Sequence, residues 1–197
     1  MKKKAMTVLT ALMIAGVTTT ALGDGSVDVT LDKVRTNVEL PASSVGSVQD
    51  LVESLGGFTN FDKKSGKLSV EKPEVNLLVL EGIQQTKSKS LVFSNPIKGW
   101  SDKDIPRSFG VFVEIDNAPV SKDLKCKVVL VAPNGKVVDS GKEWEFSTKN
   151  GTSFYFSEPF ISTKLEYYGT YKVQLQMKRT KSESYTVVGE NTFVVGR

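Results

Sequence analysis

The sequence predicts a mainly β protein, built from a small α+β module and an antiparallel β-sandwich. Two observations carry this prediction. Apolar and polar residues alternate along several runs in the second half of the chain, a pattern that puts one strand face in a core and the other in water. One segment alone, near residue 50, has apolar residues at helical spacing. The chain therefore needs one helix and many strands.

The N-terminal residues predict a secretory signal. Three lysines after Met1 precede an uncharged apolar stretch from Ala5 to Val17, the two leading parts of a signal peptide. Small residues at Ala21 and Gly23 predict cleavage before Asp24, so residues 1–23 are expected to be removed. The alternative, an uncleaved membrane anchor, is disfavoured because a spanning helix needs about 20 apolar residues. The chain is therefore expected to be secreted or associated with the cell envelope, without stable membrane insertion after cleavage.

Charge and cysteine content limit the partners and the chemistry. Loss of the three signal lysines would lower the formal net charge from +4 to +1, and no basic cluster remains to attract nucleic acid. Cys126 is the one cysteine, which excludes an intramolecular disulfide. It alternates with Val128 and Leu130, so we expect an inert core residue, with a reactive thiol as the alternative.

The first module, residues 24–83, centres on the helix. Ser47 is the expected N-cap, and Gly56-Gly57 supplies the helix stop. The apolar face is expected from Val48, Leu51, Val52 and Leu55. Strands are expected at 27–31, in a hairpin of 58–62 with 67–71, and at 76–80, where the last run would close the sheet. The helix would bury its apolar stripe against that sheet.

This module resembles a known family. The Leu55-Gly56-Gly57 helix end, the strand 58–62, the turn 63–66 and the strand Lys67-Leu68-Ser69-Val70 look like the copper amine oxidase N-terminal-like domain of secreted and surface proteins of Gram-positive bacteria. The likeness covers about 60 residues. It implies a stalk or accessory module and no oxidase activity, since the catalytic domain of the amine oxidases needs histidines that this chain lacks.

Residues 84–90 are polar and predict a linker, and residues 91–197 predict the sandwich. The turn at Pro133-Asn134-Gly135-Lys136 predicts a hairpin. Inward-facing positions are expected at Phe109, Val111, Val113 and Ile115, at Cys126, Val128 and Leu130, and at Tyr171, Val173, Leu175 and Met177. Such a series of strands suits an immunoglobulin-like β-sandwich.

No catalytic, cofactor-binding or metal-binding residue is predicted. The chain has no histidine, which removes the usual general base and the commonest transition-metal ligand. Glu143 and Glu145 share a strand face at a spacing that glycosidase carboxylates can use, but their alternation with the core-facing Trp144 and Phe146 favours two solvated glutamates. Asp102 and Asp104 could offer oxygens to Ca²⁺, although ordinary loop acids are favoured. We expect a protein that is not an enzyme.

Aromatic residues give the remaining hint of function. Phe112 and Tyr155 point away from the inward sets of their strands, and Trp100, Tyr167 and Tyr168 fall in connections. Such rings can form a platform for sugars or for a protein, or can pack beneath loops. The sequence thus favours an exported binding or scaffold protein, with cell-wall polymer or an exported protein as its partner. The alternatives are an inhibitor or chaperone-like partner of an exported enzyme, and a hydrolase that relies on carboxylates alone.

Overall fold

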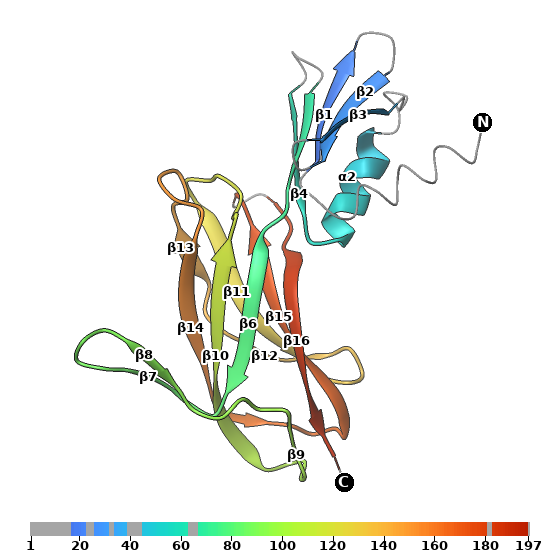
Figure 1. Cartoon of the computed structure of the whole chain (residues 1–197). Coiled ribbons are helices and arrows are strands. Elements are labelled where there is room, and N and C mark those ends of the chain that lie inside the picture. Colours follow the sequence, from blue (N-terminus) through green and yellow to red (C-terminus); the bar gives the residue numbers. More distant parts are fainter. Residues whose placement is uncertain are drawn as a thin grey trace. The chain divides into compact units, whose positions relative to one another are not determined.

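The computed structural model in Figure 1 confirms the mainly β class. It describes residues 17–22, 26–31, 34–38, 45–62, 67–180 and 183–196. The chain divides into two compact units, one up to Pro73 and one from Glu74. The first is a small α+β unit and the second is an immunoglobulin-like antiparallel sandwich.

The first unit has one sheet, in the order β3-β2-β1-β5-β4, whose neighbouring strands all run antiparallel. The strands are β1 (Val17–Leu22), β2 (Ser26–Leu31), β3 (Val34–Val38), β4 (Phe58–Asp62) and β5 (Lys67–Glu71). The predicted strand 27–31 and the predicted hairpin are confirmed, since Phe58 pairs with Glu71 and Asp62 with Lys67. The turn 63–66 lies outside the described residues.

The helix α2 (Val45–Ser54) begins two residues before the predicted N-cap. Ser47 therefore lies inside the first turn and is not the cap, a difference within the usual uncertainty of helix ends. The predicted stop is confirmed: Gly56 has a φ of 77°, and the N–H of Gly57 donates to the carbonyl of Val52 at 2.9 Å. Of the predicted apolar face, Val48 and Val52 are buried and Leu51 is half-buried, whereas Leu55 follows the helix and is 37% exposed.

The last residues of the predicted signal form β1, while residues 1–16 lie outside the described residues. Strand β1 pairs with β2 on one side and β5 on the other. Cleavage before Asp24 would remove β1. The edges of β2 and β5 that pair with β1 would then lose their partner strand.

The second unit packs two sheets face to face. The smaller has the order β14-β10-β6, from β14 (Phe154–Lys164), β10 (Pro106–Asp116) and β6 (Glu74–Leu80). The larger has the order β12-β11-β15-β16-β9, with β13 also paired to β11. Its strands are β9 (Gly99–Trp100), β11 (Leu124–Val131), β12 (Val137–Ser140), β13 (Trp144–Phe146), β15 (Gly169–Lys178) and β16 (Thr186–Val195).

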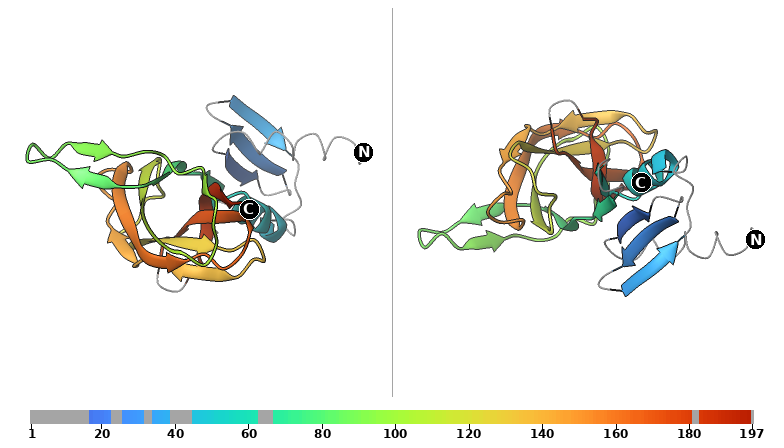
Figure 2. Two further views of the ribbon diagram at one scale, coloured as in Figure 1. Left: turned by 90° about the horizontal axis from the view of Figure 1, so that it is seen from below. Right: turned by 90° about the horizontal axis from the view of Figure 1, so that it is seen from above.

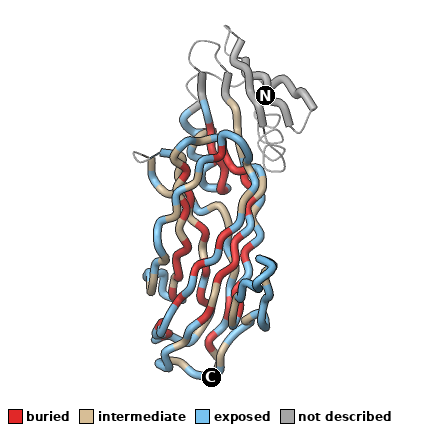
Figure 3. Tube along the Cα trace, turned by 90° about the vertical axis from the view of Figure 1, so that its left-hand side faces the viewer, coloured by how far each residue is buried: buried red, intermediate tan, exposed pale blue. Residues whose placement is uncertain are grey.

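The core lies between these sheets, and Figure 3 shows buried and exposed residues alternating along the strands. Every inward-facing position predicted for β10, β11 and β15 is buried, with exposures of 3% or less. Two local features also match the fold. Gly135, in the predicted hairpin turn, has a φ of 83°. Tyr171 at the start of β15 accepts a hydrogen bond from the backbone N–H of Tyr167, the tyrosine corner found in Greek-key sandwiches.

Two domain assignments need correction. The run 76–80 does not close the first sheet: it lies in β6, which pairs with β10 along its length. The boundary between units therefore falls at Pro73 rather than Ile83. The expected linker 84–90 lies within a hairpin of β7 (Ile83–Gln85) and β8 (Leu91–Phe93), which projects from the second unit in Figure 2. We call residues 83–93 the arm.

Apolar contacts hold the base of the arm against the sheet. The polar composition of residues 84–90 does not predict these contacts. The ring of Phe93 lies 4.8 Å from that of Phe112 on β10, measured between centroids. A Cβ on Gly110 would come within 2.9 Å of Ile83, so glycine permits the close approach of arm and sheet. The polar turn is closed by the hydroxyl of Thr86, which accepts from the N–H of Ser90 at 3.1 Å.

Candidate binding surface

Strand β14 is an edge strand of the small sheet, because β10 is its one partner among the described strands, and three hollows lie along it. The polar hollow, about 560 Å³, is lined by Ala132, Lys136, Val137, Val138, Asp139, Ile161, Ser162, Thr163, Lys164, Glu166 and Tyr167. The arm hollow, about 360 Å³, is lined by Glu81, Gly82, Ile83, Ser108, Phe109, Gly110, Ser157, Glu158, Pro159 and Ile161. The aromatic groove, about 300 Å³, is lined by Ile83, Gln85, Leu91, Phe112, Trp144, Phe146, Tyr155, Phe156 and Ser157.

The aromatic groove contains the two outward-pointing rings predicted from the sequence. Phe112 and Tyr155 both lie on the outer face of the small sheet, with ring centroids 5.9 Å apart. Phe112 is only 9% exposed because Phe93 of the arm covers it, whereas Tyr155 is 57% exposed. The groove therefore presents the open phenol ring of Tyr155 beside the covered phenyl ring of Phe112.

Trp144, which lines the groove, belongs to a hydrogen-bonded clamp with Glu158 and Lys142. The indole Nε1 of Trp144 donates to Glu158 at 2.7 Å, and the backbone N–H of Lys142 donates to the other carboxylate oxygen at 3.3 Å. The ammonium of Lys142 lies 3.4 Å from the centroid of the Trp144 ring, a cation–π arrangement. Glu158 is 5% exposed, and these donors compensate for the burial of its carboxylate.

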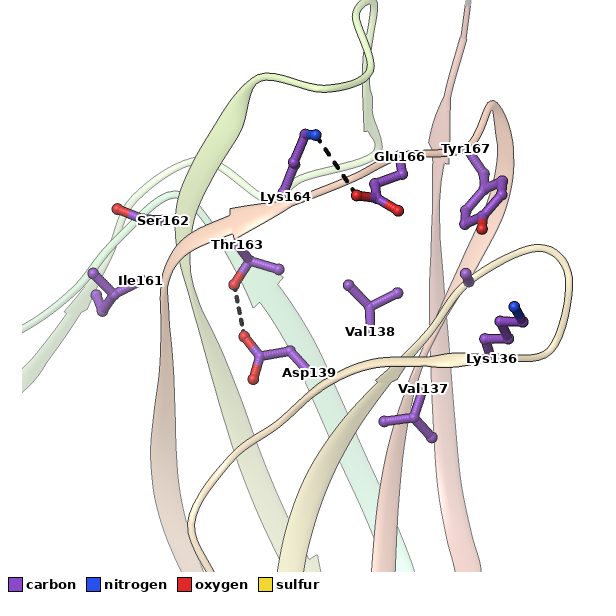
Figure 4. A pocket seen from close by; sticks show the side chains of 11 residues that line it. Lys136, Val137, Val138, Asp139, Ile161, Ser162, Thr163, Lys164, Glu166 and Tyr167 are labelled. Atoms are coloured by element: carbon purple, nitrogen blue, oxygen red, sulfur yellow. Dashed lines mark hydrogen bonds and ion pairs between the residues drawn. The ribbon is translucent and has the colours of Figure 1, made fainter.

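The polar hollow, shown in Figure 4, combines a ring with side chains of both charges. Thr163 donates to Asp139 at 2.8 Å, which joins β14 to β12 across the edge. Lys164 lies 3.6 Å from Glu166 and 3.7 Å from Asp104. Tyr167 is 38% exposed. The hollow thus offers hydroxyl, carboxylate and ammonium groups next to a phenol ring.

The other two aromatic candidates lie elsewhere. Trp100 packs at the end of the core, with its ring centroid 4.9 Å from Phe193 and 5.6 Å from Phe109. Tyr168 is 40% exposed and has the ammonium of Lys103 5.5 Å from its ring centroid. Neither lines the hollows along β14.

Glu143 and Glu145 lie on the same face, as predicted, because both contact the ammonium of Lys125. Both side chains are open to solvent, and Tyr185 also donates to Glu143. The hydrogen bond from Lys125, followed by that from Tyr185, lowers the pKa of Glu143 to about 2. A carboxyl group that acts as a general acid needs a raised pKa, so this shift has the opposite direction.

The two loop aspartates are held by neighbouring side chains. Asp102 accepts from the hydroxyl of Ser101 at 2.8 Å, and Asp104 lies 3.1 Å from the ammonium of Lys103. That lysine is the main cause of the lowered pKa of Asp104. Across the described residues, no group of three or more acidic, cysteine or histidine side chains is placed to hold a metal ion. Nor is any helix in that part of the chain long and apolar enough to cross a membrane.

Cys126 lies in the core of the second unit, as expected from its alternation with Val128. The side chain is fully buried and makes no disulfide. Burial raises the pKa of the thiol to about 12, so the nucleophilic thiolate is scarce at neutral pH.

The sequence analysis predicted neither the buried Glu158 nor the arm, although the sequence around Glu158 indicates its burial. Its neighbours at two-residue spacing are Phe154, Phe156 and Phe160, so an acidic residue occupies an inward position of an otherwise aromatic face. A buried carboxylate requires partners, which the clamp supplies. No comparable signal marked the arm, because its six strand residues are too few to show a period.

Comparison with known proteins gives partial likenesses to solved structures. No protein-family model and no curated sequence matches the chain. A β-glucuronidase of Bacteroides uniformis is similar at 13% identity and a TM-score of 0.42, over 66% of this chain and 15% of that enzyme. The chain thus spans a small part of the enzyme's length.

Two shorter structures are matched over nearly their whole length. A CARDB domain of Pyrococcus furiosus, solved with di-metal ions, has 12% identity and a TM-score of 0.32, over 64% of this chain and 96% of the domain. The putative ApaA protein of Bordetella pertussis has 12% identity and a TM-score of 0.30, over 64% and 98%. None of these similarities assigns a function to this chain.

Proposed function

We propose that the protein is an exported, non-catalytic binding protein of the bacterial cell envelope or extracellular space. The observation that carries the proposal is the aromatic groove, in which Tyr155 is 57% exposed beside the arm and the Trp144 clamp. An open ring next to buried rings and polar groups is a common composition for a recognition surface. Binding by the groove requires no cofactor.

The first unit acts in this proposal as a spacer or as an attachment unit to wall polymer. Its hairpin of β4 and β5 after a Gly-terminated helix supports the likeness to the copper amine oxidase N-terminal-like domain. Export is supported by the basic start and the apolar stretch that follows it. The mass of the protein recovered from a secreting host tests export directly: a chain that begins at Asp24 supports it, and a chain that retains residues 1–23 contradicts it.

A parallel pull-down tests the binding function. The exported protein is applied to protein-stripped Gram-positive cell-wall polymer and, separately, used as bait for the secreted proteins of its source. We expect one of the two to be captured, with loss of capture in Tyr155→Ala. The matched control is Tyr168→Ala, which removes an exposed tyrosine that lines none of the three hollows. Failure to capture polymer or protein would contradict the proposal.

The arm supports a second candidate, an inhibitor or chaperone-like partner of an exported enzyme. Val92 and Phe93 of the arm are 49% and 42% exposed, and a projecting hairpin with apolar side chains can enter a cleft of another protein. This candidate predicts a stoichiometric complex with one protein that is lost in Val92→Asp. Capture that depends on Tyr155 and is unchanged in Val92→Asp would contradict it.

A further inference from the structure

We propose that the polar hollow and the aromatic groove are the two ends of one track along β14, and that the track binds a linear, largely uncharged glycan. This inference rests on the proposed binding function and names the ligand class. Tyr155 lies at one end of the track and Tyr167 at the other.

Neighbouring hollows along the strand adjoin, because they share lining residues. Ile161 lines both the polar hollow and the arm hollow, while Ile83 and Ser157 line both the arm hollow and the aromatic groove. From Tyr155 to Ile161 the extended part of the strand covers about 20 Å, at roughly 3.3 Å per residue. A ligand that spans this length is a chain and not a single small molecule. Ile161, 70% exposed, forms an apolar ridge between the hollows.

The lining chemistry matches a glycan. Sugar rings present apolar C–H faces that pack on aromatic rings and hydroxyl groups that need both donors and acceptors. The polar hollow supplies acceptors from Asp139 and Glu166 and donors from Lys136 and Lys164. Because these four charges balance, the hollow favours a ligand of low net charge over a polyanion.

An added peptide strand fits the same edge poorly. Peptides bind an edge strand through its free backbone N–H and C=O groups. Pro159, in the middle of β14, has no N–H, and Ser162 has a φ of 52°, outside the extended region. The Thr163–Asp139 and Trp144–Glu158 hydrogen bonds also cross the edge where a new strand would pair. These features protect the edge, leaving side chains as the binding groups.

The test is a competition assay with two ring variants. The exported protein is bound to protein-stripped cell-wall polymer and displaced by soluble wall-glycan fragments, released enzymatically and sorted by length. We expect long fragments to compete at lower concentration than disaccharides. Tyr155→Ala and Tyr167→Ala should each weaken retention about five- to tenfold, the range expected from loss of about 1 kcal/mol or more of ring contact. Tyr167→Ala retains the backbone N–H that donates to the hydroxyl of Tyr171, so the tyrosine corner is preserved.

The outcomes separate this inference from the proposed function. Equal competition by disaccharides and long fragments would contradict a single track along β14. Weaker retention of Tyr155→Ala with unchanged retention of Tyr167→Ala would also contradict it. Either result is still compatible with binding at the aromatic groove. Capture of a secreted protein without retention on polymer would contradict a glycan as the ligand, while still supporting the proposed binding function. Binding to neither the polymer nor a secreted protein would contradict both the track and the proposed binding function. Tyr168→Ala serves as the control, with unchanged retention expected.

Discussion

The hydroxyl of Tyr171 lies 2.8 Å from the backbone nitrogen of Tyr167, which donates its hydrogen to it. This bond ties the connection after β14 to the start of β15, and the Tyr171 ring itself is fully buried against Phe193. The connection that it fixes carries Glu166 and Tyr167, both of which line the polar hollow. A fold-stabilising corner thus also positions one end of the candidate binding surface.

Replacing Tyr171 with Phe tests the corner. The ring contacts remain, but the part-buried N–H of Tyr167 loses its acceptor, which costs about 1–3 kcal/mol of unfolding free energy. Chemical denaturation measures this change. Tyr155→Phe is the matched control, because its hydroxyl belongs to an exposed ring, and a change within about 0.5 kcal/mol is expected. Equal stability of the two variants would contradict the role of the corner.

Gly141→Ala tests the clamp between β13 and β14. A Cβ at this position would lie 2.4 Å from Cγ and 2.5 Å from Cδ of the buried Glu158. The carboxylate would have to move away from Trp144 and Lys142, and we expect a loss of about 1–3 kcal/mol in unfolding free energy. Gly151→Ala is the control, since nothing lies within 4 Å of its Cβ. If both substitutions have the same small effect, the clamp is not rigid.

The lowered pKa of Glu143 predicts acid sensitivity. The pKa is about 2 in the folded protein, against an ordinary value of 4.5, with the hydrogen bond from Lys125 as the main cause. The stabilising effect is therefore complete above about pH 4.5 and is lost as the pH falls towards 2. Glu143→Gln should flatten part of this decline in urea-unfolding curves measured between pH 5 and pH 2. The effect is small at high salt because the carboxylate is open to solvent. If the unfolding free energy of Glu143→Gln depends on pH in the same way as that of the unmodified protein, the stabilising role of Glu143 is contradicted.

Cys126 provides a probe of the second unit's core. Burial raises the pKa of its thiol to about 12, so both access and thiolate content are low in the folded protein. At pH 8 we expect alkylation to be slow and to become fast in denaturant. Because Cys126 is the sole cysteine, mass spectrometry reports this site alone. Rapid labelling of the folded protein would show that the core opens easily.

The sequence was informative where side chains alternate along long strands. The inward sets of β10, β11 and β15 and the hairpin after β11 could be predicted because each follows from a period of two or from a Gly-containing turn. The outward direction of Phe112 and Tyr155 followed from the same period. Whether those rings are open depends on the arm, and the arm's position depends on contacts between residues distant in sequence.

Other assignments depended on long-range pairing. The run 76–80 has no local feature that distinguishes a partner in the first sheet from one in the second, and its pairing with β10 decides the matter. The polar hollow was missed for a similar reason. Asp139 and Thr163 come from strands in different sheets, and their hydrogen bond arises only when the two sheets pack.

Chemical-shift mapping of the exported protein tests the central claim, that β14 and the arm bind the ligand. Backbone amide spectra are compared with and without the soluble wall-glycan fragments. We predict perturbations confined to residues 81–93, 108–112, 132–146 and 154–167, which carry the arm, the clamp and the residues that line the three hollows. Perturbations centred instead on Lys125, Lys178 and Tyr185 of the large sheet, or none at all, would contradict the claim.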